Sequence, residues 1–185
     1  MTVDEKIIQG CISGKRRAQN QMYNAFAPGM LGVCMRYCKN LAEAEDVLQE
    51  GFVKVFRYIE KFRGDGSFEG WIRRIMVNTA ISNYNKTSKV YYEEIDENTR
   101  SFDDTSMGDE VYLPVDTEIL MQLIQQMPEG YRMVLNLYVF EGYKHREISN
   151  MLNISESTSK SQLSKGRKYL KNELEKIEKV KSLQY

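Results

Sequence analysis

Small hydroxyl and cationic side chains are concentrated in residues 156–170, ESTSKSQLSKGRKYL. Hydroxyls and the amide of Gln162 suit the edges of bases in a DNA groove, and lysine and arginine suit phosphates. The candidate DNA contacts are Ser157, Thr158, Lys160, Ser161, Ser164, Lys165, Arg167 and Lys168. This pattern favours a helix that enters the major groove. The alternative is a basic surface helix that faces only solvent.

A second short helix must position this segment. Ile148, Met151 and Leu152 share one apolar face at helical spacing. Asn153 then suits a left-handed residue at the helix end, and Ser155 suits the N-cap of the next helix. We therefore predict a helix-turn-helix whose second helix runs from Glu156 to about Leu170, followed by a charged tail.

Charge is distributed unevenly along the 185 residues, although basic and acidic residues balance at 26 each. Residues 1–86 carry a net charge of +4, residues 87–116 carry −7 and residues 117–185 carry +3. The neutral total therefore hides two mildly basic parts joined by an acidic one. Three cysteines fit a reducing compartment. We expect a cytoplasmic protein with no membrane insertion, because neither a signal peptide nor a long apolar stretch is visible.

Helical spacing of apolar residues and the scarcity of proline predict an all-α fold. We expect Pro28 and Gly29 to interrupt one helix, and Asn40, Ser67 and Asp116 or Thr117 to begin others. The expected helices span residues 4–13, 15–26, 29–38, 41–62, 68–86, 116–127, 130–140 and the helix-turn-helix.

The acidic stretch lacks helical periodicity, and so long a loop inside one compact domain is unusual. It is therefore expected to be a flexible linker between two small helical domains. The expected division is a first domain at 1–86, the acidic linker at 87–115, a helix-turn-helix domain at 116–176 and a tail at 177–185.

Four segments together resemble the extracytoplasmic-function (ECF) sigma factors, a branch of the sigma-70 family of bacterial RNA polymerase subunits. They are AEAEDVLQEGFVKVF (42–56), KFRGDGSFEGWIRRIMVNTAISNY (61–84), MPEGYRMVLNLYVFEGYKHREISNML (127–152) and NISESTSKSQLSKGRKYL (153–170). The resemblance implies family regions two and four, without region three. It also implies core RNA polymerase and promoter DNA as partners, an anti-sigma factor as a further one, and no cofactor.

The resemblance assigns roles to residues of the first domain. It implies that Asp46, Gln49, Glu50 and Val53 bind core polymerase. On the residues alone, a solvated acidic face is the favoured interpretation of Asp46 and Glu50. It implies that Phe62, Ile75 and Asn78 form a pocket for a flipped base of the minus-ten element, with Arg73, Arg74 and Lys86 at the phosphates. We interpret Trp71 as a core residue rather than a contact.

The resemblance assigns reading of the minus-thirty-five element to the helix after Ser155. Two residues depart from the family pattern: Ser159 stands where an apolar residue is common, and Gly166 where alanine is common. Glycine within a helix costs about 1 kcal/mol relative to alanine, so we expect a softer helix.

The sequence offers little for catalysis. Its one histidine, His145, begins a helix, and Cys34 and Cys38 would make only half of a zinc site, so small core residues are favoured for both cysteines. The expected function is that of a dissociable, non-enzymatic polymerase subunit that recognises and helps to open promoters. The alternatives are an autonomous helix-turn-helix transcriptional regulator and an all-α enzyme or scaffold.

Overall fold

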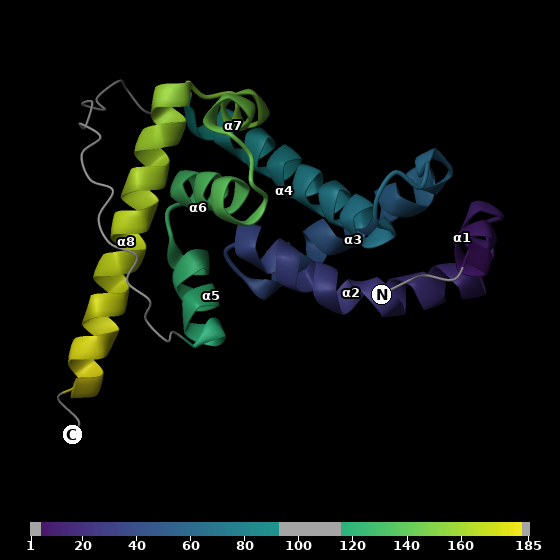
Figure 1. Cartoon of the computed structure of the whole chain (residues 1–185), viewed down its shortest axis with the longest axis horizontal. Coiled ribbons are helices and arrows are strands. Elements are labelled where there is room, and N and C mark those ends of the chain that lie inside the picture. Colours follow the sequence, from purple (N-terminus) through teal and green to yellow (C-terminus); the bar gives the residue numbers. More distant parts are fainter. Residues whose placement is uncertain (1–4, 93–115, 183–185) are drawn as a thin grey trace. The chain divides into compact units, whose positions relative to one another are not determined.

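The computed structural model describes residues 5–92 and 116–182, and the side chains of residues 5–87 and 116–179. Every regular element within these residues is helical (Figure 1). The chain divides after Lys86 into two compact units, here called unit 1 (the part before this point) and unit 2 (the part after it). The expectation of an all-α chain with two helical domains is confirmed.

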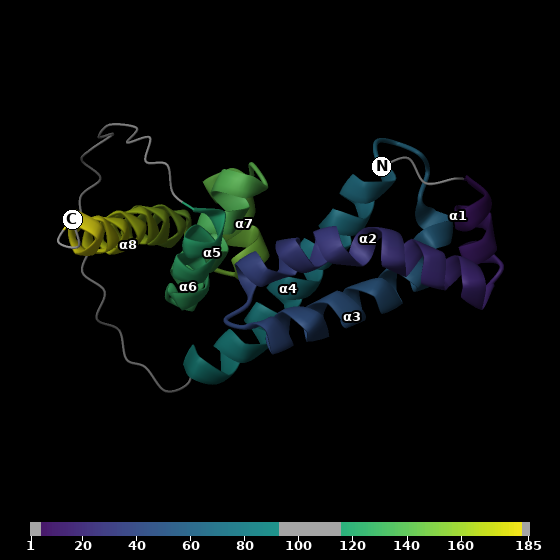
Figure 2. The ribbon, with the colours of Figure 1, turned by 90° about the horizontal axis from the view of Figure 1, so that it is seen from below.

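Unit 1 is built from three long helices and two short ones. Its elements are α1 (Glu5–Ile12), α2 (Arg16–Tyr37), α3 (Leu41–Tyr58), the 3₁₀ segment η1 (Ile59–Lys61) and α4 (Phe68–Tyr92). Helices α2, α3 and α4 lie side by side in both views (Figures 1 and 2). Met22, Val55, Ile72 and Met76 are fully buried between them. This shared apolar core holds the exposed faces of α3 and α4 in fixed positions.

Helix α2 passes through Pro28 without a break, so the expected interruption at Pro28 and Gly29 is wrong. Proline inside a helix removes one backbone hydrogen bond and disfavours the preceding turn. Phe26, Ala27 and Met30 are buried around it. Burial of apolar surface on both sides of Pro28 offsets the lost hydrogen bond.

Single polar side chains fix the starts of the next two helices. The Glu43 backbone N–H donates to Asn40 Oδ1 at 2.9 Å, and the Gly70 N–H donates to Ser67 Oγ at 3.0 Å. Both predicted N-caps are confirmed. Helix α4 runs to Tyr92, six residues beyond its expected end. The first residues of the expected linker at 87–115 are therefore helical, and residues 93–115 lie outside the described part of the chain.

Unit 2 contains the helix-turn-helix. Its elements are α5 (Thr117–Gln126), α6 (Glu129–Leu135), the π-helical segment η2 (Asn136–Phe140), α7 (His145–Leu152) and α8 (Glu156–Ser182). Asp116 caps α5, because its Oδ1 accepts from the Glu118 N–H at 3.0 Å. Figure 2 shows α8 foreshortened at the left, beside α5, α6 and α7. Val134, Leu137 and Ile148 are fully buried in the core of this unit.

A buried arginine ties the turn between α5 and α6. Arg132 is 1% exposed, and its Nη1 donates to the carbonyl oxygens of Gln125 at 2.7 Å and Met127 at 3.2 Å. The Gln125 carbonyl lies in the last turn of α5 and the Met127 carbonyl belongs to the residue that caps this helix, where carbonyls lack partners within the helix. The guanidinium therefore fixes α5 onto α6, and α6 in turn supports α8.

Helix α8 continues to Ser182, so the expected helix end near Leu170 is wrong. The end of the expected charged tail, residues 183–185, lies outside the described residues. Half-buried Leu170, Leu174 and Ile177 recur at helical spacing in its second half. This apolar stripe gives the extension a reason to stay helical beside α5. Within the described residues, no helix combines the length and apolarity of a membrane span.

We predict that Gly166→Ala stabilises unit 2. A Cβ at Gly166 would meet Tyr131 Cβ at 3.4 Å and Met127 Sδ at 3.6 Å, which are ordinary contacts. The change should therefore gain about 1 kcal/mol of helix propensity. Urea unfolding followed through the amide signals of unit 2 measures this gain. The matched control is Gly51→Ala in α3, where a Cβ would collide with buried Met76 and destabilise unit 1. A lower unfolding midpoint for Gly166→Ala would contradict the prediction.

Candidate nucleic-acid interface

The turn between α7 and α8 has the local conformation that its residues favour. Among the described residues, Asn153 is the one non-glycine residue with a positive φ, at +56°. At the start of α8, the Thr158 N–H donates to Ser155 Oγ at 3.0 Å. Both sequence predictions for this turn are confirmed. At the start of α7, Glu147 Oε2 accepts from the Lys144 backbone N–H at 2.8 Å. Half-buried Ile154 lies in the turn between the two helices. The turn conformation and these contacts together fix the angle between α7 and α8.

The predicted DNA contacts on α8 fall into two groups. Ser157, Lys160, Ser164, Arg167 and Lys168 are exposed, at intervals that place them along one side of the helix. Thr158, Ser161 and Lys165 are half-buried at its margin. Ser161 Oγ donates to the Thr158 carbonyl at 3.0 Å, and Thr158 Oγ1 lies 2.8 Å from Ser155 Oγ. The exposed group therefore forms the face available to a ligand, here called the α8 face.

Ser159, the departure from the family pattern, faces the interior. It is fully buried, and its Oγ lies 2.9 Å from His145 Nδ1. A buried hydroxyl without a partner would be costly, so the histidine explains how serine is tolerated here. The sequence reasoning missed this pairing. The sequence did hold a signal for this pairing: it has one histidine, His145, and one serine, Ser159, at a position where an apolar residue is common.

In unit 1, the predicted minus-ten residues lie along α4 and the loop before it. Arg74 and Asn78 are exposed, whereas Phe62, Arg73 and Ile75 are half-buried. The Phe62 ring lies 5.7 Å from Trp71 and 5.0 Å from Phe68 between centroids, which places an aromatic cluster at the start of α4.

Trp71, Ile75 and Asn78 follow one another at helical spacing on the same side of α4. With Phe62 they form a strip, here called the α4 strip, that begins aromatic and ends in an exposed amide. Trp71 is half-buried, so its interpretation as a core residue is only partly correct. Such a strip presents flat apolar surfaces beside a hydrogen-bonding group, which is the combination that an unpaired base needs.

The predicted polymerase-binding residues on α3 do not behave alike. Asp46, Gln49 and Val53 are exposed, with Val53 at 65%. Glu50 is half-buried instead: its Oε1 pairs with Lys54 Nζ at 2.8 Å, and its Oε2 accepts from Asn83 Nδ2 at 3.3 Å. The hydrogen bond from Lys54 holds the pKa of the Glu50 carboxyl below its ordinary value. Glu50 therefore joins α3 to α4, while its three neighbours face outward.

Lys54 extends this connection toward the α4 strip. Its Nζ also donates to Thr79 Oγ1 at 3.1 Å, and Thr79 donates to the Ile75 carbonyl at 2.8 Å. Thr79 is fully buried and directly follows Asn78. Sequence reasoning missed Lys54, Thr79 and Asn83, because no local pattern marks a contact between residues 25 or 33 positions apart.

Comparison with known proteins identifies the family. Residues 22–90 match the model of sigma-70 region 2, and residues 117–170 match that of sigma-70, region 4. The chain belongs to the ECF branch of the sigma-70 family. The two matched segments contain the α4 strip and the α8 face of this sigma factor, respectively.

Relatives of this sigma factor match it over nearly the whole chain. The RNA polymerase sigma-H factor of Pseudomonas aeruginosa is 28% identical over 183 residues, covering 94% of this chain and 95% of that protein. The ECF RNA polymerase sigma factor SigW of Bacillus subtilis is 28% identical over 181 residues, covering 92% and 96%. A solved structure of sigma factor RpoE from Bartonella quintana, in complex with the anti-sigma factor NepR, shares the fold: its TM-score is 0.50 at 16% identity, covering 84% of this chain and 96% of that one.

The cysteines of this sigma factor lie in the core of unit 1. Cys34 and Cys38 are 1% and 6% exposed, which is how small apolar residues behave. Burial raises the pKa of the Cys34 thiol to about 12, with a further contribution from the nearby Cys38. Among the described residues, no three His, Cys, Asp or Glu side chains gather into a metal-binding group.

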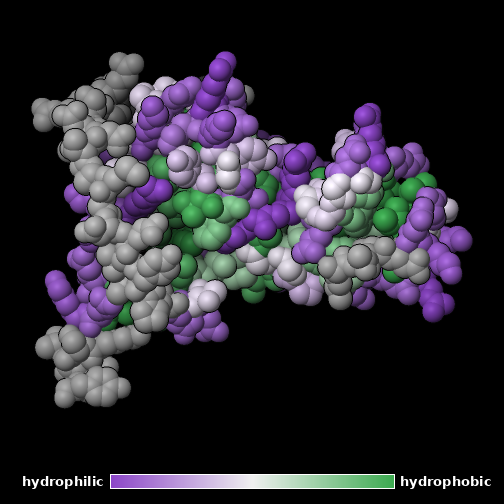
Figure 3. Space-filling view, in the orientation of Figure 1, coloured by the Kyte–Doolittle hydropathy of each residue, from purple (hydrophilic) through white to green (hydrophobic). Residues whose placement is uncertain are grey.

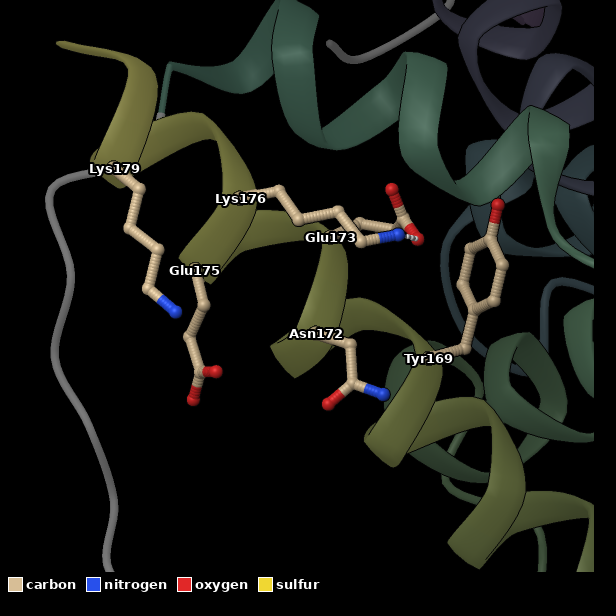
Figure 4. Close-up of a pocket in the computed structure, with 6 residues that line it drawn as sticks. All are labelled: Tyr169, Asn172, Glu173, Glu175, Lys176 and Lys179. Atoms are coloured by element: carbon tan, nitrogen blue, oxygen red, sulfur yellow. Dashed lines mark hydrogen bonds and ion pairs between the residues drawn. The ribbon is translucent and has the colours of Figure 1, made fainter. Parts of the chain in front are cut away.

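A depression on the second half of α8 lies apart from the α8 face. It is lined by Tyr169, Asn172, Glu173, Glu175, Lys176 and Lys179 (Figure 4). Figure 4 shows the Lys176 ammonium directed at the Glu173 carboxylate, at 2.7 Å. Charges of both signs line the depression, so it does not continue the cationic α8 face.

We predict that Lys54→Met raises the pKa of Glu50 toward its ordinary value, because the largest cause of the lowered pKa is removed. The carboxyl signal of Glu50 in an NMR titration measures the change. A lowered folded-state pKa adds stability above the ordinary pKa, and this stability is lost as the pH falls through the lowered value. Because the pair is partly exposed, the variant should lose at most about 1 kcal/mol at neutral pH. An unchanged Glu50 titration would contradict the assignment.

Proposed function

We propose that this sigma factor binds core RNA polymerase through α3, reads the minus-ten element through the α4 strip and reads the minus-thirty-five element through the α8 face. The observation that carries the proposal is the α8 face itself. Its exposed hydroxyls and cations lie on the second helix of a helix-turn-helix, directly after a capped left-handed turn. Membership of the sigma-70 family indicates that core RNA polymerase is the partner with which this DNA contact is made.

Of the four predicted polymerase-binding residues on α3, Asp46, Gln49 and Val53 are exposed. An acidic and an amide side chain beside an exposed valine suit a partner helix that offers cations and an apolar contact. Glu50 contributes less directly, because its carboxylate is paired with Lys54 within unit 1. We therefore assign Asp46 the main electrostatic contact with polymerase and Glu50 the task of supporting the surface.

The α4 strip supports capture of an unpaired base. A base extruded from the duplex would stack on Phe62, Trp71 or Ile75, while the Asn78 amide contacts its edge. Arg74 is exposed one turn before Asn78, where it can hold a strand phosphate, with Arg73 beside it and Lys86 about two turns beyond Asn78. This arrangement favours the melted form of the DNA over the duplex, which is what promoter opening requires.

The α8 face supports duplex recognition. Ser157, Lys160 and Ser164 point outward from the first turns of the helix, where helix-turn-helix proteins contact base edges. Arg167 and Lys168 follow, and suit phosphates at the edge of the groove. This division gives sequence selection to the hydroxyls and affinity to the cations.

We also propose how the chain acts, where it works and what regulates it. The chain acts by binding and not by catalysis, since sigma factors are transcription initiation factors. It works in the cytoplasm, where core polymerase is found. An anti-sigma factor regulates it, as the solved complex of the Bartonella quintana protein with NepR illustrates for a protein of the same fold.

The central test is reconstitution with purified core polymerase. We expect promoter-specific runoff products, and we expect Asp46→Arg to abolish capture of the chain by immobilised core enzyme. The matched control is Glu45→Arg, which makes the same charge change on exposed α3 about a quarter turn away. No specific product from any genomic template, together with tight operator binding by the free chain, would favour an autonomous regulator instead.

A second test concerns the α4 strip. We expect Asn78→Ala to reduce open-complex formation about three- to tenfold, because one hydrogen bond to the flipped base is lost. Permanganate reactivity of unpaired thymines near the start site measures this effect. Ser82→Ala is the control, since Ser82 is exposed one turn further along α4 and donates only to the Asn78 carbonyl. Equal effects of the two substitutions would remove the special role of Asn78.

A further inference from the structure

Tyr138 occupies an unusual position for a large aromatic residue in unit 2. It lies in the π-helical segment η2 and is 37% exposed, whereas the preceding Leu137 is fully buried. The next two residues, Val139 and Phe140, are also exposed. In the space-filling view, hydrophobic side chains reach the surface of the molecule near α6 (Figure 3).

One face of the Tyr138 ring is fixed by His145. The two rings stack with centroids 4.7 Å apart and an angle of 24° between their planes. His145 is itself held in place, because its Nδ1 is hydrogen-bonded to Ser159 Oγ at 2.9 Å and Ser159 is fully buried on α8. The tyrosine is thus braced against the recognition helix through the histidine.

Arg167 of the α8 face is the second partner of Tyr138. Its guanidinium carbon lies 5.8 Å from the centroid of the tyrosine ring, within the range of a cation–π contact. Arg167 is exposed and carries a long side chain whose rotamer freedom is lost when it binds a phosphate. A ring that already orients the guanidinium reduces this loss, because part of the ordering occurs before DNA arrives.

We propose that Tyr138, braced by His145 and Ser159, is a positioning residue that holds the Arg167 guanidinium ready for a DNA phosphate. The inference rests on the proposed function of the α8 face and adds a group outside the helix-turn-helix to it. Tyr138 does not contact the DNA in this scheme. It acts through Arg167, so its contribution disappears when Arg167 is absent.

The first experiment uses the free full-length chain and needs no polymerase. NMR relaxation of the Arg167 Nε–Hε group reports how firmly the guanidinium is held. Tyr138→Leu should lower its order parameter, and Tyr138→Phe, which retains the ring, should leave it unchanged. Tyr143→Leu is the control, because among the described residues Tyr143 makes no ring contact with Arg167. An Arg167 signal that is insensitive to Tyr138→Leu overturns the proposal.

The second experiment measures binding of the reconstituted holoenzyme to a promoter fragment over a range of salt concentrations. Tyr138→Leu should weaken binding about two- to fivefold, the range expected for an exposed cation–π contact. Arg167→Ala should weaken it further and reduce the slope against salt by about one. In the Arg167→Ala background, Tyr138→Leu should have no additional effect. Additive losses would show that Tyr138 acts independently of Arg167 and would overturn the proposal.

The two experiments separate this inference from the proposed function. If no holoenzyme forms, the proposed function fails, and the same double-mutant comparison is made on binding of the free chain to a random-sequence duplex. If the holoenzyme forms and recognises promoters but the Tyr138 and Arg167 effects add, only the positioning role fails. His145→Gln provides an independent check, since removing the brace should loosen Arg167 in the same direction as Tyr138→Leu.

Discussion

The left-handed turn at Asn153 determines how the DNA-binding part of this molecule is presented. It reverses the chain between α7 and α8, and Ser155 immediately caps the new helix. With this angle fixed, Ile148 and Leu152 of α7 and Leu163 of α8 can be buried together. The same geometry turns the opposite side of α8 outward with its hydroxyls and cations. A β-branched residue at position 153 would resist this conformation and disturb both the core and the α8 face.

In unit 1, polar side chains fix the position of α3 relative to α4. The Glu50–Lys54 pair on α3 reaches Asn83 and Thr79 of α4, and Thr79 is the immediate neighbour of Asn78. The helix that would meet polymerase is therefore joined by hydrogen bonds to the helix that would meet unpaired DNA. The two bonds between the helices, at 3.1 and 3.3 Å, are partly shielded from water and help to fix the register of α3 against α4.

Local chemistry explains why much of the fold was predictable. Asn40, Ser67, Asp116 and Ser155 all cap helices as their side chains suggest, and the helix-turn-helix follows from a few neighbouring residues. The errors lie where distant contacts outweigh local preference. Pro28 sits inside α2 because buried residues flank it on both sides, and α8 continues past Leu170 because a half-buried stripe lies beside α5.

The candidate sites show the same division. Spacing and residue type placed Asp46, Asn78 and three α8 cations, Lys160, Arg167 and Lys168, on outward faces, because helical periodicity is a local property. Periodicity did not reveal that Glu50 accepts a hydrogen bond from Asn83, that Ser159 is buried against His145, or that Arg167 lies over Tyr138. Each of these contacts joins different elements, and their partners become apparent only when the helices are packed together.

Because the three thiols of unit 1 are buried, their chemical reactivity reports how often the core of this unit opens. Cys11, Cys34 and Cys38 are all less than one-tenth exposed, and Cys11 Sγ lies 3.9 Å from Met22 Sδ inside the core. An alkylating reagent or an oxidant can reach these sulfur atoms only after the surrounding helices separate. The rate at which each sulfur is modified under native conditions therefore measures how often that part of the core opens.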